Sequence, residues 1–253
     1  MTNGTIQTMQ TEITGSRSTT PALYLIPSGL GGDVTETVWP GGNLDRIRHI
    51  RTFVVENIRS ARRFLRQAGF DADFADVQFH VLNKHTGETE MLRFLDAAQR
   101  GEDTGLLSEA GTPCVADPGQ ALVRLAHQRH IRVIPLVGAS SILLGLMASG
   151  FNGQQFAFHG YLPIKGAERQ RKIRELERQA YTTDQTQIFM EAPFRNNALL
   201  EDLVSVCKPD TLLCVACDLS LPTEYIRSFP AARWKKEMPD LHKRTSIFLM
   251  YRP

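Results

Sequence analysis

The sequence is poor in cysteine and in long apolar runs, and its charges almost balance. Only four cysteines occur in 253 residues, and their spacing does not resemble the framework of a disulfide-rich secreted domain. The longest apolar run, SSILLGLMASG, is about half of the roughly 20 residues that a transmembrane helix needs. A net charge of +2 neither requires nor excludes a polyanionic partner. We therefore expect a cytoplasmic protein with a reduced interior and no membrane partner.

Two further features have structural interpretations. Cys214 and Cys217 form a C-x-x-C within TLLCVACDL, which reads as a strand, and residues three apart on a strand point to opposite faces. This favours packing over a metal or redox site, so we expect no metal. The stretch MTNGTIQTMQTEITGSRSTT is polar and has no apolar core or basic start, which predicts a disordered tail over 1–20 and no signal peptide.

Apolar, β-branched segments alternate with segments of helical periodicity in the first half of the chain. This alternation predicts crossover connections and a mostly parallel sheet. Strands are predicted at 22–26, 51–56, 77–82, 104–109 and 131–136, with helices at 57–68, 88–100 and 119–130.

Beyond residue 150 there are more strands per helix, which permits antiparallel pairs. Strands are predicted at 156–162, 187–194, 211–217, 223–229 and 246–252, and helices at 167–180 and 196–207. The predicted fold is α/β with two domains and a ligand cleft between them. The first domain spans 21–150 with a mostly parallel sheet, and the second spans 151–253 with a mixed sheet.

Four loops that follow predicted strands have ligand-binding character: IPSGLGGD (26–33), SEAGTPCVADPG (108–119), LVGASS (136–141) and FMEAPFR (189–195). The first is not G-x-G-x-x-G and precedes a further loop, VTETVWPGGNLDRI, which argues against a dinucleotide fold. Asp117 before Pro-Gly favours an N-cap over a catalytic role. Ser140 and Ser141 open a helix and can bind a polar ligand edge or cap that helix. Glu191 and Arg195 can hold each other or a substrate.

In this order and spacing the loops resemble the tetrapyrrole methylase superfamily of S-adenosylmethionine-dependent methyltransferases, and within it the enzymes that act on ribosomal RNA. The resemblance spans roughly residues 22–252. SEAGTP, ADPG and LVGASS are similar to the family's S-D-A-G-T-P, D-P-G and P-G-P stretches, FMEAPFR to Y-E-A-x-x-R, and GYLPIKG to G-F-L-P-x-K. It implies a two-domain α/β fold, a homodimer, and S-adenosylmethionine bound between the domains.

The resemblance also implies which residues contact this methyl donor. They lie in all four loops: Pro27, Leu30, Gly31, Gly111, Thr112, Pro113, Ala116, Ser140, Ser141, Met190 and Glu191. The chain departs from the family mostly outside these loops. An acid is replaced by Asn57 in ENIR, a histidine and an acid by Leu82 and Lys84 in HVLNKH, and a glycine by Arg244 in KRT.

Charge distribution favours RNA as the partner. Seven arginines and two acids lie between Asp45 and Arg66. Arg59, Arg62, Arg63 and Arg66 fall on one helical face, which can follow phosphates. Two further basic segments lie at 165–179 and 233–244. For residues 165–179 the alternative to an RNA-binding surface is a solvated helical face whose charges form ion pairs within the helix.

Methyl transfer to a ribose hydroxyl needs a base or a stabilised oxyanion. The polar candidates near strand ends are His80, Glu109, Asp117, Lys165, Glu191 and Arg195, and Glu109 has the best position for the catalytic role. The sequence thus predicts a methyltransferase acting on a 2'-hydroxyl of ribosomal RNA. A methyltransferase of a tetrapyrrole or other small molecule, and an inactive donor- or RNA-binding relative, are the alternatives.

Overall fold

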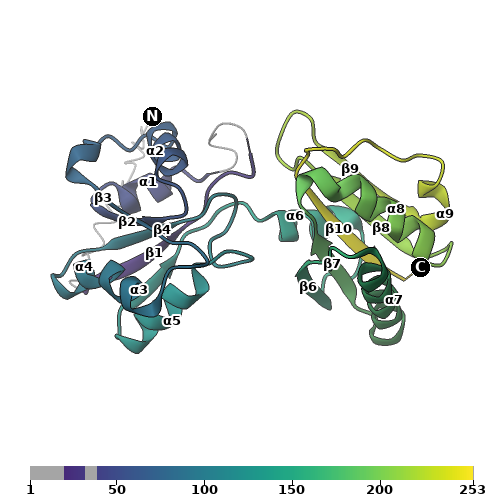
Figure 1. Cartoon of the computed structure of the whole chain (residues 1–253). Helices are drawn as coiled ribbons and strands as arrows, with labels where there is room; N and C mark the ends of the chain where they lie inside the picture. Colours follow the sequence, from purple (N-terminus) through teal and green to yellow (C-terminus); the bar gives the residue numbers. More distant parts are fainter. Residues whose placement is uncertain (1–19, 32–38, 253) are drawn as a thin grey trace, which may run out of the picture.

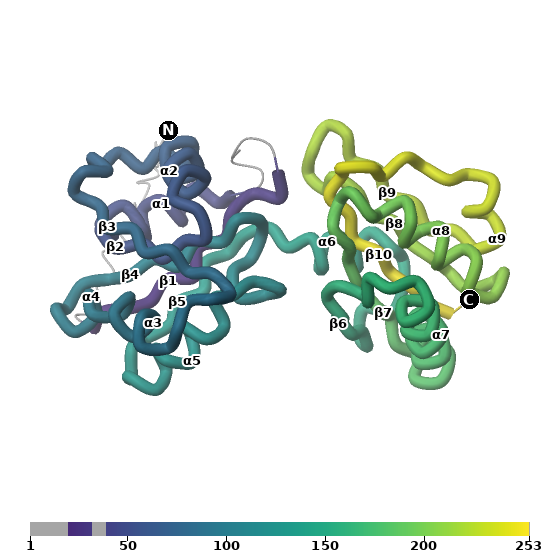
Figure 2. The backbone as a smooth tube through the Cα atoms, in the orientation of Figure 1, coloured from purple at the N-terminus to yellow at the C-terminus, as the bar shows by residue number. Residues whose placement is uncertain are grey.

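The computed structural model describes residues 20–31 and 39–252. Figure 1 shows two lobes joined by an extended segment. Figure 2 follows the backbone from the purple-to-teal lobe, through that segment, into the green-to-yellow lobe. All of the predicted tail except Thr20, and residues 32–38 of the first loop region, lie outside the described residues.

The first lobe is built on a sheet of five parallel strands in the order β3-β2-β4-β1-β5. The strands are β1 (Ala22–Ile26), β2 (Thr52–Val55), β3 (Gln78–Val81), β4 (Thr104–Leu107) and β5 (Arg132–Pro135). β1, β2 and β4 lie inside the sheet, and their apolar runs suit strands that are covered on both faces. The predicted strands and their parallel arrangement are confirmed.

Helices cover both faces of this sheet. Figure 1 shows α1 (Gly42–Ile47) and α2 (Ile58–Gln67) on one face. On the other face lie α3 (Glu88–Phe94), α4 (Asp96–Gln99) and α5 (Gln120–Gln128). Alternate residues of β2 show the division, because Phe53 packs in the core beneath α2 and Val54 in the core beneath α5. A short 3-10 helix, η1 (Phe74–Asp76), precedes β3.

The second lobe contains a mixed sheet in the order β6-β7-β10-β8-β9, in which only the β6–β7 pair is parallel. Its strands are β6 (Phe156–Tyr161), β7 (Thr186–Met190), β8 (Leu212–Cys217), β9 (Tyr225–Pro230) and β10 (Ser246–Tyr251). The helices α7 (Gly166–Thr183), α8 (Asn196–Val206) and α9 (Ala231–Trp234) pack in a core that includes Trp234 and Phe248. The 3-10 helix η2 (Pro193–Arg195) follows β7.

Helix α6 (Ser141–Ser149) packs against β8, β9 and β10, on the face of the second sheet opposite to α7 and α8. Cys214 lies in the core under α6, and Cys217 lies in the core under α8. The two cysteines thus face opposite sides of β8, as the strand interpretation predicts. The division into domains at residue 150 stays a prediction, and α6 precedes that boundary although it contacts the second sheet.

Two local expectations are corrected. The segment predicted as a further loop contains the short helix α1, because a turn at Gly41–Gly42 precedes residues that bury Ile47 in the core. The helix predicted over 88–100 is two helices, divided at Leu95, whose φ and ψ of −94° and 1° leave the helical region. Within the described ranges, no helix is both long and apolar enough to cross a membrane.

Candidate functional site

The strand order of the first sheet brings the predicted loops together. β2, β4, β1 and β5 are consecutive neighbours, so the loops that follow their carboxyl ends lie side by side. Glu56 follows β2, the 108–119 loop follows β4, Leu30 follows β1, and Ser140 follows β5. β3 lies at the far edge, which keeps the altered HVLNKH segment away from this group.

Gly111 joins the loop after β4 to the loop after β1. Its N–H donates to Gly29 O at 3.2 Å, and its carbonyl accepts from Ser28 N at 3.0 Å and from the Ser108 hydroxyl. The residue has a φ of +68°, a left-handed conformation that favours glycine. A Cβ at this position would lie 3.1 Å from Leu30 Cδ2 and 3.3 Å from the Ala139 carbonyl. The glycine therefore allows three loops to meet.

Helix α6 points its amino end into the same region. Ser140 is its N-cap, and the serine hydroxyl accepts a hydrogen bond of 3.5 Å from Leu143 N. This confirms that Ser140 caps the helix. Ser141 follows at the first helical position, where backbone N–H groups have no partner within the helix. Hydroxyl groups and a helix start thus face the space between the lobes.

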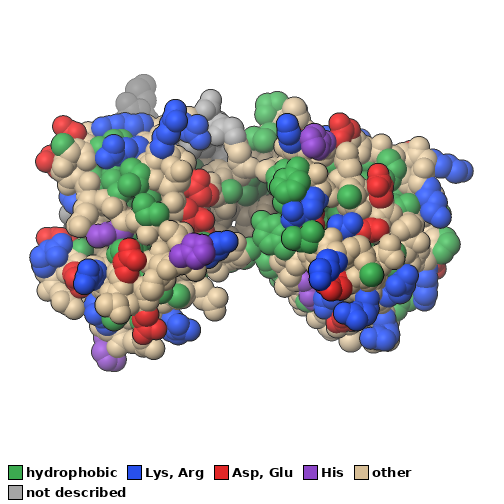
Figure 3. Space-filling model, in the orientation of Figure 1, with side chains coloured by type: hydrophobic (Ala, Val, Ile, Leu, Met, Phe, Trp, Pro, Cys, Tyr) green, Lys and Arg blue, Asp and Glu red, His purple; other side chains and the backbone are tan. Residues whose placement is uncertain are grey.

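The second lobe contributes an apolar wall. Met190 at the end of β7 pairs with Ile247 at the start of β10, so both come to one edge of the mixed sheet. Phe158 on the neighbouring β6 packs against the same core as Met190 and Ile247. Figure 3 shows a hollow between the lobes, with hydrophobic side chains along its wall on the second lobe and acidic side chains on the first.

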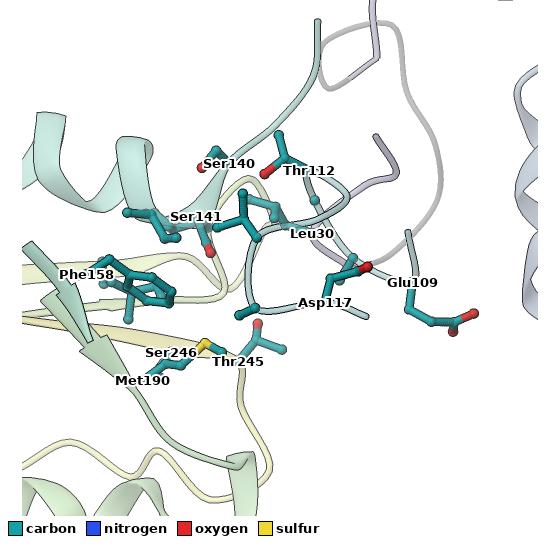
Figure 4. Close-up of a pocket in the computed structure, with 18 of the residues that line it drawn as sticks. Leu30, Glu109, Thr112, Asp117, Ser140, Ser141, Phe158, Met190, Thr245 and Ser246 are labelled. Carbon is teal, nitrogen blue, oxygen red and sulfur yellow. The ribbon is translucent and has the colours of Figure 1, made fainter. Parts of the chain in front are cut away.

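A pocket of about 360 Å³ lies between these elements. Figure 4 shows Thr112, Ser140 and Ser141 around it, with Phe158, Met190 and Thr245 on the opposite side. The lining residues are Leu30, Glu56, Glu109, Ala110, Gly111, Thr112, Val115, Ala116, Asp117, Ser140, Ser141, Ile142, Phe158, Tyr161, Met190, Glu191, Pro193, Ala216, Leu219, Thr245, Ser246 and Ile247.

Eight of the eleven predicted donor-binding residues line this one pocket: Leu30, Gly111, Thr112, Ala116, Ser140, Ser141, Met190 and Glu191. Pro27, Gly31 and Pro113 do not. Pro27 and Pro113 are buried. A Cβ on Gly138 would overlap the ring of Pro27, which shows how closely the first and third loops pack there. The donor-binding role of all eleven residues stays a prediction.

The acidic side chains of the pocket differ in their partners. Glu109, the predicted catalytic residue, accepts a hydrogen bond of 2.6 Å from the Ser60 hydroxyl on α2, and Figure 4 shows its side chain directed away from the other labelled residues. Asp117 does not provide the N-cap of α5, which is Gly119; its carboxylate accepts from Gly119 N at 2.9 Å. The other side of Asp117 faces Glu56.

Glu56 is hydrogen-bonded to the Asp117 side chain and accepts from the backbone N–H of Glu109. Glu56 is an exposed residue, and partial desolvation of its carboxyl group, together with the negative charges of Asp117 and Glu109, raises the pKa of Glu56 to about 7. A carboxyl group in this state exchanges its proton near neutral pH, which suits acid–base chemistry.

Glu191 is held by arginine through one carboxylate oxygen, and its Oε2 has no hydrogen-bond partner among the described residues. Its side chain is fully buried, with Oε1 accepting from Arg195 Nη2 at 2.6 Å and from Ala192 N at 2.7 Å. Arg169 approaches Oε2 at 4.0 Å. Of the two sequence interpretations, the structure confirms that Glu191 and Arg195 hold each other. The pair fixes the turn after β7 that places Met190.

The predicted arginine face on α2 divides into two pairs. Arg62 lies over the rings of Phe74 and Phe79 at 5.5 and 5.2 Å, and Arg66 lies 4.1 Å from the ring centroid of Phe74. Arg59 and Arg63 are exposed, and neither has an ion pair with any residue that the structure describes. Since Ser60 bonds to Glu109, this free pair begins at the edge of the pocket.

The departures at Asn57, Leu82, Lys84 and Arg244 lie outside the pocket lining, whereas Glu109, where the family has an aspartate, lines it. Asn57 is the N-cap of α2 and accepts from Arg59 N at 2.8 Å. Leu82 is buried in the core of the first lobe, and Lys84 is exposed beyond the edge strand β3. Arg244 binds Asp218 with an Nε–Oδ2 distance of 2.8 Å. Each of these side chains therefore has a structural explanation.

Sequence reasoning missed several pocket residues, chiefly Glu56, Phe158, Tyr161, Thr245 and Ser246. Glu56 ends a predicted strand in ENIR, and a carboxyl group at a strand end was a usable signal, although only the structure shows that the neighbouring strand leads into the 108–119 loop. The residues of β6 and β10 had no such signal, because nothing local indicates which ends of the mixed sheet face the first lobe.

The sequence profile of the Tetrapyrrole (Corrin/Porphyrin) Methylases matches residues 44–233. Ribosomal RNA small subunit methyltransferase I of Pseudomonas aeruginosa is 34% identical over 201 residues, covering 76% of this chain and 68% of that protein. The protein of the same description from Vibrio cholerae is 29% identical over 236 residues, covering 91% of this chain and 77% of that protein.

Solved structures show the same fold. The methyltransferase CobJ superposes with a TM-score of 0.61 at 19% identity, covering 92% of this chain and 94% of that chain. Uroporphyrin-III C-methyl transferase from Thermus thermophilus, complexed with S-adenyl homocysteine, gives a TM-score of 0.56 at 13% identity, covering 91% and 97%. These likenesses confirm the predicted fold class of two α/β lobes with a parallel and a mixed sheet.

Proposed function

Because the chain belongs to the tetrapyrrole methylase family and is an S-adenosylmethionine-dependent methyltransferase, we propose that it methylates a ribose 2'-hydroxyl of ribosomal RNA. The main observation in support of this proposal is that Arg59 and Arg63 on α2 are exposed beside the pocket and have no ion pair with any described residue. Relatives described as ribosomal RNA small subunit methyltransferase I match most of the chain. Ribosomal RNA as the acceptor implies that the protein works in the cytoplasm.

The pocket suits the methyl donor. Hydroxyl groups of Thr112, Ser140 and Ser141 face an apolar wall that includes Phe158 and Met190, an arrangement that fits a nucleoside with a polar amino-acid tail. The donor supplies a methyl group on a positively charged sulfur. The chain aligns the acceptor with that group and excludes water, since little other chemistry is needed for an in-line displacement.

An RNA acceptor is supported by the charge at the pocket edge. Arg59 and Arg63 are one helical turn apart on α2 and are exposed, so they can bind successive phosphates while a ribose enters the pocket. The helix α7 also carries many charges, but it covers the face of the second sheet opposite to α6 and the apolar wall. We therefore assign the RNA path to α2 and not to α7.

Exposed aromatic side chains at the opposite edge support an unstacked nucleotide. Tyr161 ends β6 and is 59% exposed, and Phe194 follows the neighbouring β7 and is 62% exposed. Arg195 lies 4.6 Å from the ring centroid of Phe194. Aromatic faces beside a cation can stack on bases that have left a helix. The proposed acceptor is therefore a ribose in a loop or other single-stranded segment.

The decisive experiment maps ribose methylation on small-subunit ribosomal RNA from a strain that lacks this gene. We expect one 2'-O-methyl group to be absent and to return when the purified protein and labelled S-adenosylmethionine are added to those subunits. Unchanged methylation, with no label transferred, would contradict the proposed acceptor. Labelling of a tetrapyrrole such as uroporphyrinogen would instead support the small-molecule alternative, which the apolar wall also favours.

The homodimer is also proposed. Leu143 and Met147 lie one turn apart on α6 with exposures of 52% and 78%, and Val137 in the preceding segment is 73% exposed. Such a group of apolar side chains is suited to a second copy of the chain. Light scattering during gel filtration is expected to give twice the mass of 28.3 kDa. The double variant Leu143→Glu with Met147→Glu is expected to give the mass of one chain, 28.3 kDa.

A further inference from the structure

The pocket holds few groups that can accept a proton. Of the described residues that line it, those with titratable side chains are Glu56, Glu109, Asp117, Tyr161 and Glu191, and none is a histidine, lysine or cysteine. A ribose hydroxyl is a weak nucleophile, so its proton needs an acceptor as the new bond forms. The choice of base is therefore limited to this small set.

Three of these five titratable residues are poor candidates for the base, because they are bound to other side chains or lie at the outer edge of the pocket. Both oxygens of Glu191 are buried, and its carboxylate is bound to Arg195. The Glu109 carboxylate accepts from Ser60 and points away from the pocket. Tyr161 stands on the outer edge, more than half exposed. The carboxyl groups of Glu56 and Asp117 remain, and these two groups are hydrogen-bonded to each other.

We propose that Glu56, positioned by Asp117, accepts the proton of the hydroxyl group that is methylated. This inference rests on the proposed function and adds the residue that performs its proton transfer. Glu56 ends β2 and Asp117 lies in the loop after β4, and β2 and β4 are neighbouring parallel strands. Both residues line the pocket, and Figure 4 shows Asp117 on the same side as Thr112 and opposite Met190.

The step balances with these groups alone. The hydroxyl O–H bond breaks, and its proton moves to the Glu56 carboxylate. The oxygen electron pair forms the new O–C bond, while the electron pair of the broken C–S bond stays on sulfur and leaves S-adenosylhomocysteine. The neutral Glu56 then returns its proton to water. Asp117 accepts a hydrogen bond from Glu56 once Glu56 holds the proton, which stabilises the protonated form, and Asp117 is therefore a positioning residue.

The electrostatics agree with this geometry. Partial desolvation and the charges of Asp117 and Glu109 raise the pKa of Glu56, the backbone N–H of Glu109 lowers it, and the net result is a pKa of about 7. A base with a pKa near the working pH is strong enough to take a proton and is still largely ionised. Methylation is therefore expected to speed up as the pH rises through this value.

The test compares Glu56→Gln with the wild type on small ribosomal subunits from the deletion strain. We expect kcat to fall by about 10²–10⁴-fold, the usual contribution of a general base, and the pH dependence near neutrality to disappear. Donor affinity by calorimetry should change little, which reports that the variant is folded. Glu201→Gln, an exposed glutamate on α8, is the matched control. A Glu56→Gln variant with at least a tenth of wild-type kcat and the same pH profile would overturn the inference.

A second variant separates a positioning role from a merely structural one. Asp117→Asn removes the largest charge that raises the Glu56 pKa, so the midpoint of the pH–rate profile should move to lower pH with activity retained in part. Glu109→Gln should move it in the same direction by less. An Asp117→Asn midpoint that stays in place or moves to higher pH contradicts the pair.

Carboxyl-carbon NMR titration tests the pair without any acceptor. We expect one carboxyl group to titrate at about pH 7 in the wild type, to be absent from Glu56→Gln and to shift to lower pH in Asp117→Asn. If the wild type labels no RNA but this titration is seen, the proposed acceptor is wrong and the proton-accepting pair stands. If no such group titrates, the pair is wrong whatever the acceptor.

Discussion

Ser60 and Glu109 are 49 residues apart in the chain, and the Ser60 hydroxyl donates a hydrogen bond of 2.6 Å to the Glu109 carboxylate. This bond ties the start of α2 to the loop after β4. It places the free arginines of α2 beside the pocket, and it holds the carboxylate of Glu109, the predicted catalytic residue at the pocket lining, toward α2. One contact thus connects the proposed RNA path with the reassignment of the base.

The arginine pair should control RNA affinity through charge. Arg59→Ala with Arg63→Ala removes two phosphate contacts, so the slope of log K against log salt should become shallower by about 0.7 for each, as for single-stranded nucleic acid. Filter binding at several salt concentrations measures this slope. Arg171→Ala with Arg174→Ala, two exposed arginines of α7, should leave it unchanged. An equal effect of both pairs would contradict the assignment to α2.

The exposed aromatic residues should contribute through stacking. Tyr161→Ala and Phe194→Ala are each expected to weaken binding of single-stranded RNA by about 1–3 kcal/mol, the value of one base stacked on one ring. Fluorescence anisotropy with a labelled oligonucleotide checks this. Phe156→Ala, at the opposite end of β6 and 40% exposed, provides the comparison and should have no effect. If gel filtration shows that Phe194→Ala changes the oligomeric state instead, the ring serves a protein contact.

Gly111 should be essential for the donor pocket. Gly111→Ala places a side chain at a φ of +68° and a Cβ within 3.4 Å of two neighbouring loops, at a cost of about 1–3 kcal/mol in strain. We expect lower stability in chemical denaturation and weaker S-adenosylmethionine binding by calorimetry. Gly153→Ala, which has open space around it, is the control. Normal donor affinity in Gly111→Ala would argue against binding in this pocket.

Glu56 should lower stability at neutral pH. Its pKa is raised in the folded protein from 4.5 to about 7, so between these values the folded state binds more protons than the unfolded state. Stability from this group is therefore present at acid pH and is lost as the pH rises through 7. Glu56→Gln should be more stable than the wild type above that pH, with a difference that shrinks toward pH 4.5. In urea denaturation, a stability difference between the two proteins that stays constant from pH 4.5 to 7 would contradict the raised pKa of Glu56.

The second lobe shows which structural features local sequence patterns predict and which they do not. The spacing of apolar residues predicted β6 to β10 and the helices α7 and α8, because the apolar repeat of a strand or helix is visible within a few consecutive residues. It did not indicate that α6 packs on β8 to β10, because an apolar helix with no polar face can lie against either sheet. Phe158 and Ile247 of the apolar wall were missed for the same reason, whereas Met190 was predicted.

The sequence by itself determined the strands and the parallel first sheet, because these follow from periodicity, and its resemblance to a known family indicated eight of the residues that meet in one pocket. Only the tertiary structure decided that Glu56 and Asp117 are hydrogen-bonded neighbours. Glu56 meets Asp117 because β2 lies beside β4, a pairing of strands about 50 residues apart in the chain that no local pattern encodes. Likewise, Glu109 accepts a hydrogen bond from Ser60, a partner that becomes its neighbour only when the chain has folded.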